Sequence, residues 1–133
     1  TLRIDLVRPR AASALATEVT LPEAFAIDLP KVSIARSKPF SLSWTPPSPT
    51  QSIKLTLGGD CLRTNARVLD SDVGTFTWSV ADWHVPEGHE TESCPVAIDL
   101  VREGGSIRNG DGLAPIQLFR SSQSRRLTLI AAP

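Results

Sequence analysis

The segment from Ala81 to Ser93 holds the side chains that are best suited to metal chemistry. Within it, the run His84-Val85-Pro86-Glu87-Gly88-His89-Glu90 carries two imidazoles and two carboxylates, and such groups are ligands for zinc and copper. One hypothesis is therefore a metal-dependent enzyme that uses the His84/His89 loop. Pro86 and Gly88 interrupt any helix that would align these ligands, and an HExxH motif is absent. We favour a solvated polar loop, and we expect neither a metal site nor a cofactor.

A second acidic cluster, Asp70-Ser71-Asp72, is the best candidate for a calcium site, with Asp60 or Asp111 as further ligands. An EF-hand loop needs a glycine at its sixth position and a glutamate at its twelfth, and neither is present. Aspartates in turns usually satisfy their own backbone through side-chain hydrogen bonds. We favour this interpretation, in which the cluster forms a turn.

Signatures of other catalytic chemistry are missing from the sequence. It contains no GxSxG nucleophile elbow, no P-loop and no GxGxxG motif. A Ser–His–acid triad needs an oriented histidine, and the two histidines, His84 and His89, both lie in the polar segment. We therefore expect that the protein is not an enzyme.

The three tryptophans divide into two groups. Trp44 and Trp78 occupy inward positions by strand alternation, whereas Trp83 lies in the polar segment, where we expect it to be partly exposed. An exposed tryptophan with polar neighbours can anchor a sugar or a partner protein. The alternative is a plug that covers one end of the fold. The predicted weak binding site consists of Asp82, Trp83, His84 and His89.

Cys61 and Cys94 both lie at expected strand edges, the first after a Gly-Gly-Asp turn and the second at the start of an apolar run. No CxxC motif is present, which argues against a thioredoxin-like or zinc-knuckle motif. We expect a Cys61–Cys94 disulfide, which would contribute roughly 3–4 kcal/mol by restricting the unfolded chain. Such a bond indicates an oxidising compartment: periplasmic, cell surface or secreted. The alternative is two reduced, buried thiols in a cytosolic domain.

Short runs of β-forming residues alternate with turn residues along nearly the whole chain, and no long helical pattern interrupts them. Prolines and glycines end most of these runs. This pattern predicts an all-β fold, a two-layer antiparallel β-sandwich of immunoglobulin-like type. The expected strands cover residues 2–7, 18–21, 25–29, 40–44, 53–57, 61–69, 75–80, 94–102, 116–119 and 126–130.

The length of 133 residues fits one domain, 1–133. We expect a leading strand and linker over residues 1–16, with Ala11–Ala16 as the linker or a single helical turn, and the sandwich proper over 17–133. Pairing of the leading strand in cis with an edge strand is favoured over strand addition to a neighbouring subunit. The chain begins at Thr1 and contains no methionine, so we expect a processed or trimmed product, and removal of an export signal is one way to obtain it.

Charge offers little guidance to a partner. The 14 basic and 14 acidic residues cancel, so no net field would attract nucleic acid. No apolar run reaches the ~20 residues that a membrane span requires. Basic residues gather near both chain ends, and acidic residues gather between them. We favour solvated surfaces over electrostatic pairing of subunits in a homo-oligomer. The residues concerned are Arg3, Arg8, Arg10, Arg120, Arg125 and Arg126, against Asp82, Glu87, Glu90 and Glu92.

The run Ser41-Leu42-Ser43-Trp44-Thr45-Pro46-Pro47 resembles the second strand of a fibronectin type III domain, in which prolines follow a buried tryptophan. The tyrosine corner of those domains has no counterpart, because the chain lacks tyrosine. The layout from Val19 through Trp44, Cys61 and Cys94 to Arg125 is similar to small envelope or lipoprotein-associated domains of myxobacterial type, mostly without assigned function. The resemblance implies a β-sandwich domain and no particular activity.

Three hypotheses follow for function, and a fold alone does not choose among them. The first is a non-catalytic extracellular or periplasmic domain that binds a protein or glycan partner at the cell envelope. The second is a structural subunit of a surface assembly that uses the N-terminal strand and complementary charges. The metal-dependent enzyme ranks last.

Overall fold

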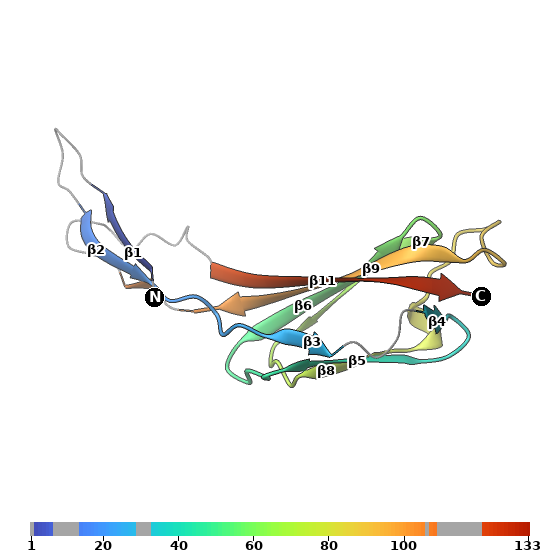
Figure 1. The fold of residues 1–133 in the computed structure, drawn as a ribbon, viewed down its shortest axis with the longest axis horizontal. Coiled ribbons are helices and arrows are strands. Elements are labelled where there is room, and N and C mark those ends of the chain that lie inside the picture. The colour runs from blue at the N-terminus through green and yellow to red at the C-terminus, as the bar shows by residue number, and fades with distance from the viewer. Residues whose placement is uncertain (1, 7–13, 29–32, 106, 109–120) are drawn as a thin grey trace.

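The computed structural model describes residues 2–6, 14–28, 33–105, 107–108 and 121–133. In this part of the chain, eleven strands form three sheets, and one short 3-10 helix, η1 (Val80–Asp82), interrupts them (Figure 1). The strands are β1 (Leu2–Leu6), β2 (Ala14–Val19), β3 (Ala26–Asp28), β4 (Ser33–Ala35), β5 (Phe40–Thr45), β6 (Ser52–Gly59), β7 (Leu62–Leu69), β8 (Thr75–Trp78), β9 (Cys94–Gly104), β10 (Ile107–Arg108) and β11 (Ser121–Ala132).

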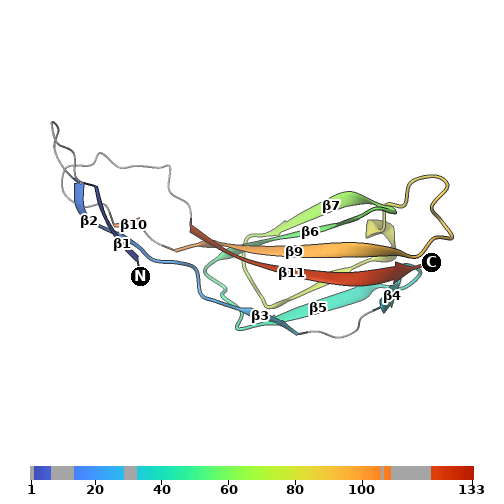
Figure 2. The ribbon, with the colours of Figure 1, turned by 45° about the horizontal axis from the view of Figure 1, so that its top comes forward.

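Two of the sheets face each other and form the two layers (Figure 2). The larger sheet has the order β4-β11-β9-β6-β7, and the smaller has the order β3-β5-β8. All neighbouring strands run antiparallel except β4, which pairs in parallel with the end of β11. The expected all-β class with a two-layer, sandwich-like arrangement is therefore confirmed.

The core lies between the two layers and follows from the alternation of the strands. In β5, burial alternates strictly, so Phe40, Leu42 and Trp44 face inward while serine and threonine face solvent. The same period in β6 buries Ile53 and Leu55. Each strand thus contributes one apolar face, as an antiparallel sheet with one wet surface requires.

Cys61 and Cys94 form the expected disulfide, with 5.9 Å between their Cα atoms. The bond joins the turn between β6 and β7 to the start of β9, and both cysteines are buried. It therefore links two segments at one end of the larger sheet. Within the described part of the chain, no helix has the length and apolar composition needed to cross a membrane.

A third sheet, β1-β2-β10, lies beyond the opposite end of the sandwich (Figure 2). The leading strand pairs in cis, as favoured, but its partner is β2, outside the two facing sheets. The expectation of a linker or helical turn over Ala11–Ala16 is wrong for its last three residues, because β2 begins at Ala14. β2 therefore crosses the expected boundary between residues 16 and 17.

Several element boundaries differ from those expected. β11 begins at Ser121, before the expected start at Arg126, because it pairs with β9 along its length. β4 and β10 were not expected, since each is too short to show an alternating pattern. The expected strand over residues 116–119 lies outside the described residues, as do Arg8, Arg10, Asp111 and Arg120.

Asp72 is part of a buried polar network and not of a calcium site. Its carboxylate accepts hydrogen bonds from the Trp44 indole N–H at 2.6 Å and from the Gly74 backbone N–H at 3.0 Å. It also pairs with Arg102, and neither side chain of this pair is exposed to solvent. The calcium interpretation is therefore wrong for Asp72, and the favoured interpretation of a self-satisfied turn is confirmed by the Gly74 bond.

Arg102 continues the network into the segments beside it. Its guanidinium donates to the carbonyl oxygens of Glu23 at 2.8 Å and Pro46 at 2.6 Å. The same group lies 4.5 Å from the centre of the Phe25 ring, and Arg125 lies 5.3 Å from that ring. Arg102 thus ties β9 to the chain between the third sheet and the sandwich.

Candidate functional site: a groove between two sheet edges

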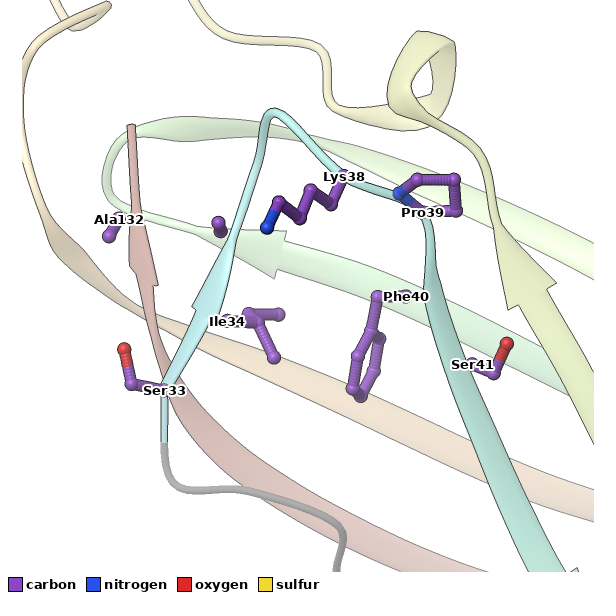
Figure 3. A pocket seen from close by; sticks show the side chains of 8 residues that line it. Ser33, Ile34, Lys38, Pro39, Phe40, Ser41 and Ala132 are labelled. Carbon is purple, nitrogen blue, oxygen red and sulfur yellow. The ribbon is translucent and has the colours of Figure 1, made fainter.

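A surface groove of about 500 Å³ lies between β4 and the beginning of β5 (Figure 3). The groove exists because the chain changes layers here: β3 pairs in the smaller sheet, whereas β4 pairs in the larger sheet. The lining residues come from β4, the following turn, the start of β5 and the end of β11. They are Ser33, Ile34, Ala35, Lys38, Pro39, Phe40, Ser41 and Ala132.

Both walls of the groove are strand edges. Among the described residues, β4 is the last strand of its sheet and pairs with β11 alone. β3 pairs with β5 only over Ser43–Thr45, so Phe40–Leu42 has β8 as its one partner among the described residues. A strand edge presents unpaired N–H and C=O groups that another extended chain can use.

The groove combines an apolar floor with a polar rim. The side chains of Ile34 and Phe40 lie between the two strands and are each 7% exposed (Figure 3). Ser33 and Ser41 are exposed at the rim, and the exposed Lys38 side chain extends across the upper part of the groove. Among the described residues, no carboxylate lies within ion-pair distance of Lys38. The groove therefore offers backbone partners, an apolar floor and one positive charge.

The expectation that Trp83 is partly exposed is wrong. Trp83 is 7% exposed and belongs to the core cluster, so it acts as the plug that was the alternative interpretation. The 3-10 helix η1 turns the segment back over the end of the sandwich, and the backbone of Arg63 in β7 bonds to the His84 carbonyl at 2.8 Å. Polarity of the surrounding residues correctly indicated a loop, but could not show that the loop folds inward.

Asp82 holds this segment in place. Its carboxylate accepts hydrogen bonds from the Ser79 hydroxyl and from the Ser79 backbone N–H, both at 2.8 Å, and it forms an ion pair with Arg67. The pKa of Asp82 is lowered below its ordinary value, mainly because the Ser79 hydroxyl donates a hydrogen bond to the carboxylate. The positive charge of Arg67 acts in the same direction. These bonds assign Asp82 a local structural role.

Neither histidine belongs to a cluster of three or more metal-ligating side chains among the described residues. His84 is exposed, while His89 Nδ1 lies 2.7 Å from the Glu92 carboxylate. Over the described ranges, no three side chains of His, Cys, Asp or Glu lie close enough to hold a metal ion. Of the predicted weak site, Trp83 is buried and Asp82 is held by local bonds, whereas His84 is exposed and His89 is partly exposed.

Arg36 is a buried arginine that was not predicted from the sequence, and it binds the later part of the 81–93 segment. Its guanidinium donates to the carbonyl oxygens of His89, Glu90 and Glu92 at 3.4, 3.0 and 2.6 Å. It also lies 3.6 Å from the Cys61 sulfur. Nothing in the run around Arg36 signals burial, because the partners of its guanidinium lie 25 to 56 residues away along the chain.

Comparison with known proteins adds no assignment: no protein-family model, no curated protein and no solved structure matches this chain.

Proposed function

We propose that the protein is a non-catalytic, exported domain that binds an extended segment of a partner protein in the groove between β4 and β5. The observation that carries this proposal is the pair of strand edges, β4 and Phe40–Leu42, on either side of an apolar floor. In strand addition, main-chain hydrogen bonds supply affinity and pockets for alternate side chains supply specificity. Ile34 and Phe40 would receive alternate apolar side chains of the ligand.

A protein partner is favoured over a glycan. Stacking against a sugar needs an exposed aromatic ring, and Trp83 is buried. The exposed large hydrophobic residues in the described part of the chain are all aliphatic. Lys38 at the rim favours a ligand that carries a carboxylate beside its apolar residues.

The proposal includes an immunoglobulin-like topology. Its support is the strand order. In the lettering of immunoglobulin strands, β3-β5-β8 corresponds to A-B-E, and β4-β11-β9-β6-β7 corresponds to A′-G-F-C-C′. Strand A of that fold is thus divided between the two sheets, as β3 and β4. The parallel pairing of β4 with the last strand agrees with that division. The disulfide departs from the immunoglobulin pattern, because it lies within one sheet and does not cross between the layers.

An extracellular or periplasmic location completes the proposal. Disulfides persist in oxidising compartments, and the bond between Cys61 and Cys94 closes a long stretch of chain, with a sequence separation of 33. In the chain-entropy model such a closure contributes roughly 3–4 kcal/mol. A domain of ordinary stability would depend on a contribution of this size, so it fits an environment that keeps the bond oxidised.

Selection of a phage-displayed random peptide library against the folded domain tests the groove. We expect selected peptides to combine alternate apolar residues with an acidic residue, and to lose at least about tenfold in affinity for Lys38→Glu. Lys54→Glu is the matched control, since Lys54 is also exposed but lies on β6. Calorimetric titration gives the affinities, and NMR shift perturbation locates the site. Peptides that bind both variants equally, or a library that yields no binder, would contradict the proposal.

A further inference from the structure

The environment of the disulfide is unequal at its two sulfur atoms. The Arg36 guanidinium, which carries a full positive charge, lies 3.6 Å from the Cys61 sulfur. The Cys94 sulfur instead faces a neutral donor, the backbone N–H of Cys61, at 3.3 Å. A charged donor stabilises a sulfur anion more strongly than a neutral one. Cys61 is therefore the sulfur whose thiolate form this site stabilises.

The exposure of the two residues differs in the same sense, although both are buried. Cys94 is 7% exposed and Cys61 only 1%. An incoming thiol therefore reaches Cys94 with less rearrangement, while Cys61 is enclosed with Arg36. The charge and the exposure are separate observations, and both make Cys94 the attacked atom and Cys61 the leaving group.

Arg36 has no carboxylate partner among the described residues. Its contacts are the carbonyl oxygens of His89, Glu90 and Glu92, which are dipoles, and the Cys61 sulfur. Among the described residues, no carboxylate lies within ion-pair distance of its guanidinium. A buried charge that lacks a counter-ion gains from one that forms beside it. Cleavage of the disulfide supplies that counter-ion as the Cys61 thiolate.

We propose that the Cys61–Cys94 disulfide is a thiol–disulfide exchange site at which an external thiol attacks one particular sulfur atom, that of Cys94. The thiolate of the external thiol attacks the Cys94 sulfur and forms a mixed disulfide there. The bond between Cys94 and Cys61 breaks, and its electron pair leaves with Cys61 as a thiolate paired with Arg36. A second equivalent of the external thiol then attacks the external sulfur of the mixed disulfide. Cys94 is released as a thiol, and the two external thiols leave as their own disulfide.

The position of the mixed disulfide is the first test, and it uses the unaltered protein. The folded protein is incubated with reduced glutathione, and exchange is stopped with acid, because the thiolate is the nucleophile. Peptic digestion at low pH and mass spectrometry then locate the adduct. We expect glutathione on Cys94. Glutathione predominantly on Cys61, or equally on both cysteines, overturns the proposal.

The role of the charge is tested by two substitutions that both lose the fork of carbonyl contacts. Arg36→Lys keeps the positive charge, and Arg36→Gln removes it, so loosening of the loop affects both variants alike. We expect glutathione to reduce Arg36→Lys on the order of tenfold faster than Arg36→Gln. Equal rates for the two variants show that Arg36 is only structural. The control is Arg126→Gln, because Arg126 is an exposed arginine on β11. Glutathione should reduce this variant at the same rate as the unaltered protein.

Discussion

Among the described residues, each end of the sandwich buries one arginine, and the two ends accommodate the charge in different ways. Arg102, at the end next to the third sheet, forms an ion pair with Asp72 in which neither side chain is exposed. Arg36, at the disulfide end, is held by carbonyl dipoles and a sulfur atom. The first charge is neutralised inside the fold, so its end is locked. The second lacks a carboxylate partner among the described residues, so its end keeps a capacity to stabilise a new anion.

Removing the counter-ion of Arg102 should produce the largest effect. Asp72→Asn leaves a fully buried guanidinium without its carboxylate, and we expect a loss of about 3–5 kcal/mol in the free energy of unfolding. Urea denaturation measures it. Asp99→Asn is the control, because Asp99 pairs with Arg126 at the surface, where water screens the attraction and the pair contributes little. A loss for Asp72→Asn as small as that of the control would show that the buried pair does not lock this end.

Opening the disulfide should weaken the other end by a comparable or smaller amount. The double substitution Cys61→Ser with Cys94→Ser removes the closure of the intervening chain, and we expect a loss of about 2–5 kcal/mol. Thermal and urea unfolding of the double variant, compared with the oxidised protein, measure the difference. Unchanged stability would mean that the Arg36 contacts alone hold this end together.

Replacing each arginine by methionine compares the two ends directly. Arg102→Met strands the Asp72 carboxylate in the core and should cost about 3–5 kcal/mol. Arg36→Met strands only neutral carbonyl groups and should cost about 1–3 kcal/mol. Urea denaturation of both variants gives the ranking. Equal losses, or a larger loss for Arg36→Met, would contradict the distinction between a locked and an open charge.

The smallest effect concerns pH and the segment over the disulfide end. The hydrogen bonds from Ser79 lower the pKa of Asp82 from its ordinary value of 3.8, so the folded state binds that proton more weakly than the unfolded state. The resulting stability is present above about pH 4 and is lost as the pH falls through the lowered value. Unfolding measured between pH 5 and 2 should show a weaker dependence for Asp82→Asn. If Asp82→Asn and the unaltered protein showed the same pH dependence of unfolding, Asp82 would not contribute to the loss of stability in acid.

Local patterns in the chain predicted more of the fold than of the site. Strict alternation in β5 and β6 identifies their inward residues because a strand has a period of two. The same parity extends through β9, from Cys94 to Arg102, and it was a signal that Arg102 faces inward. The groove carried no such signal, because it forms where Ser33–Ala35 meets a strand almost one hundred residues later in the chain.

By itself, the sequence determined the all-β class and most strand positions, and it limited an intramolecular disulfide to the pair Cys61–Cys94. The first two depend on alternation and on turn residues, and the third on the presence of only two cysteines. The tertiary structure alone decided that Trp83 is a plug, that Arg36 lies against the Cys61 sulfur, and that β4 and β5 border a groove. Each of these depends on contacts between segments that are distant along the chain, and burial or exposure of a side chain there is set by what folds over it.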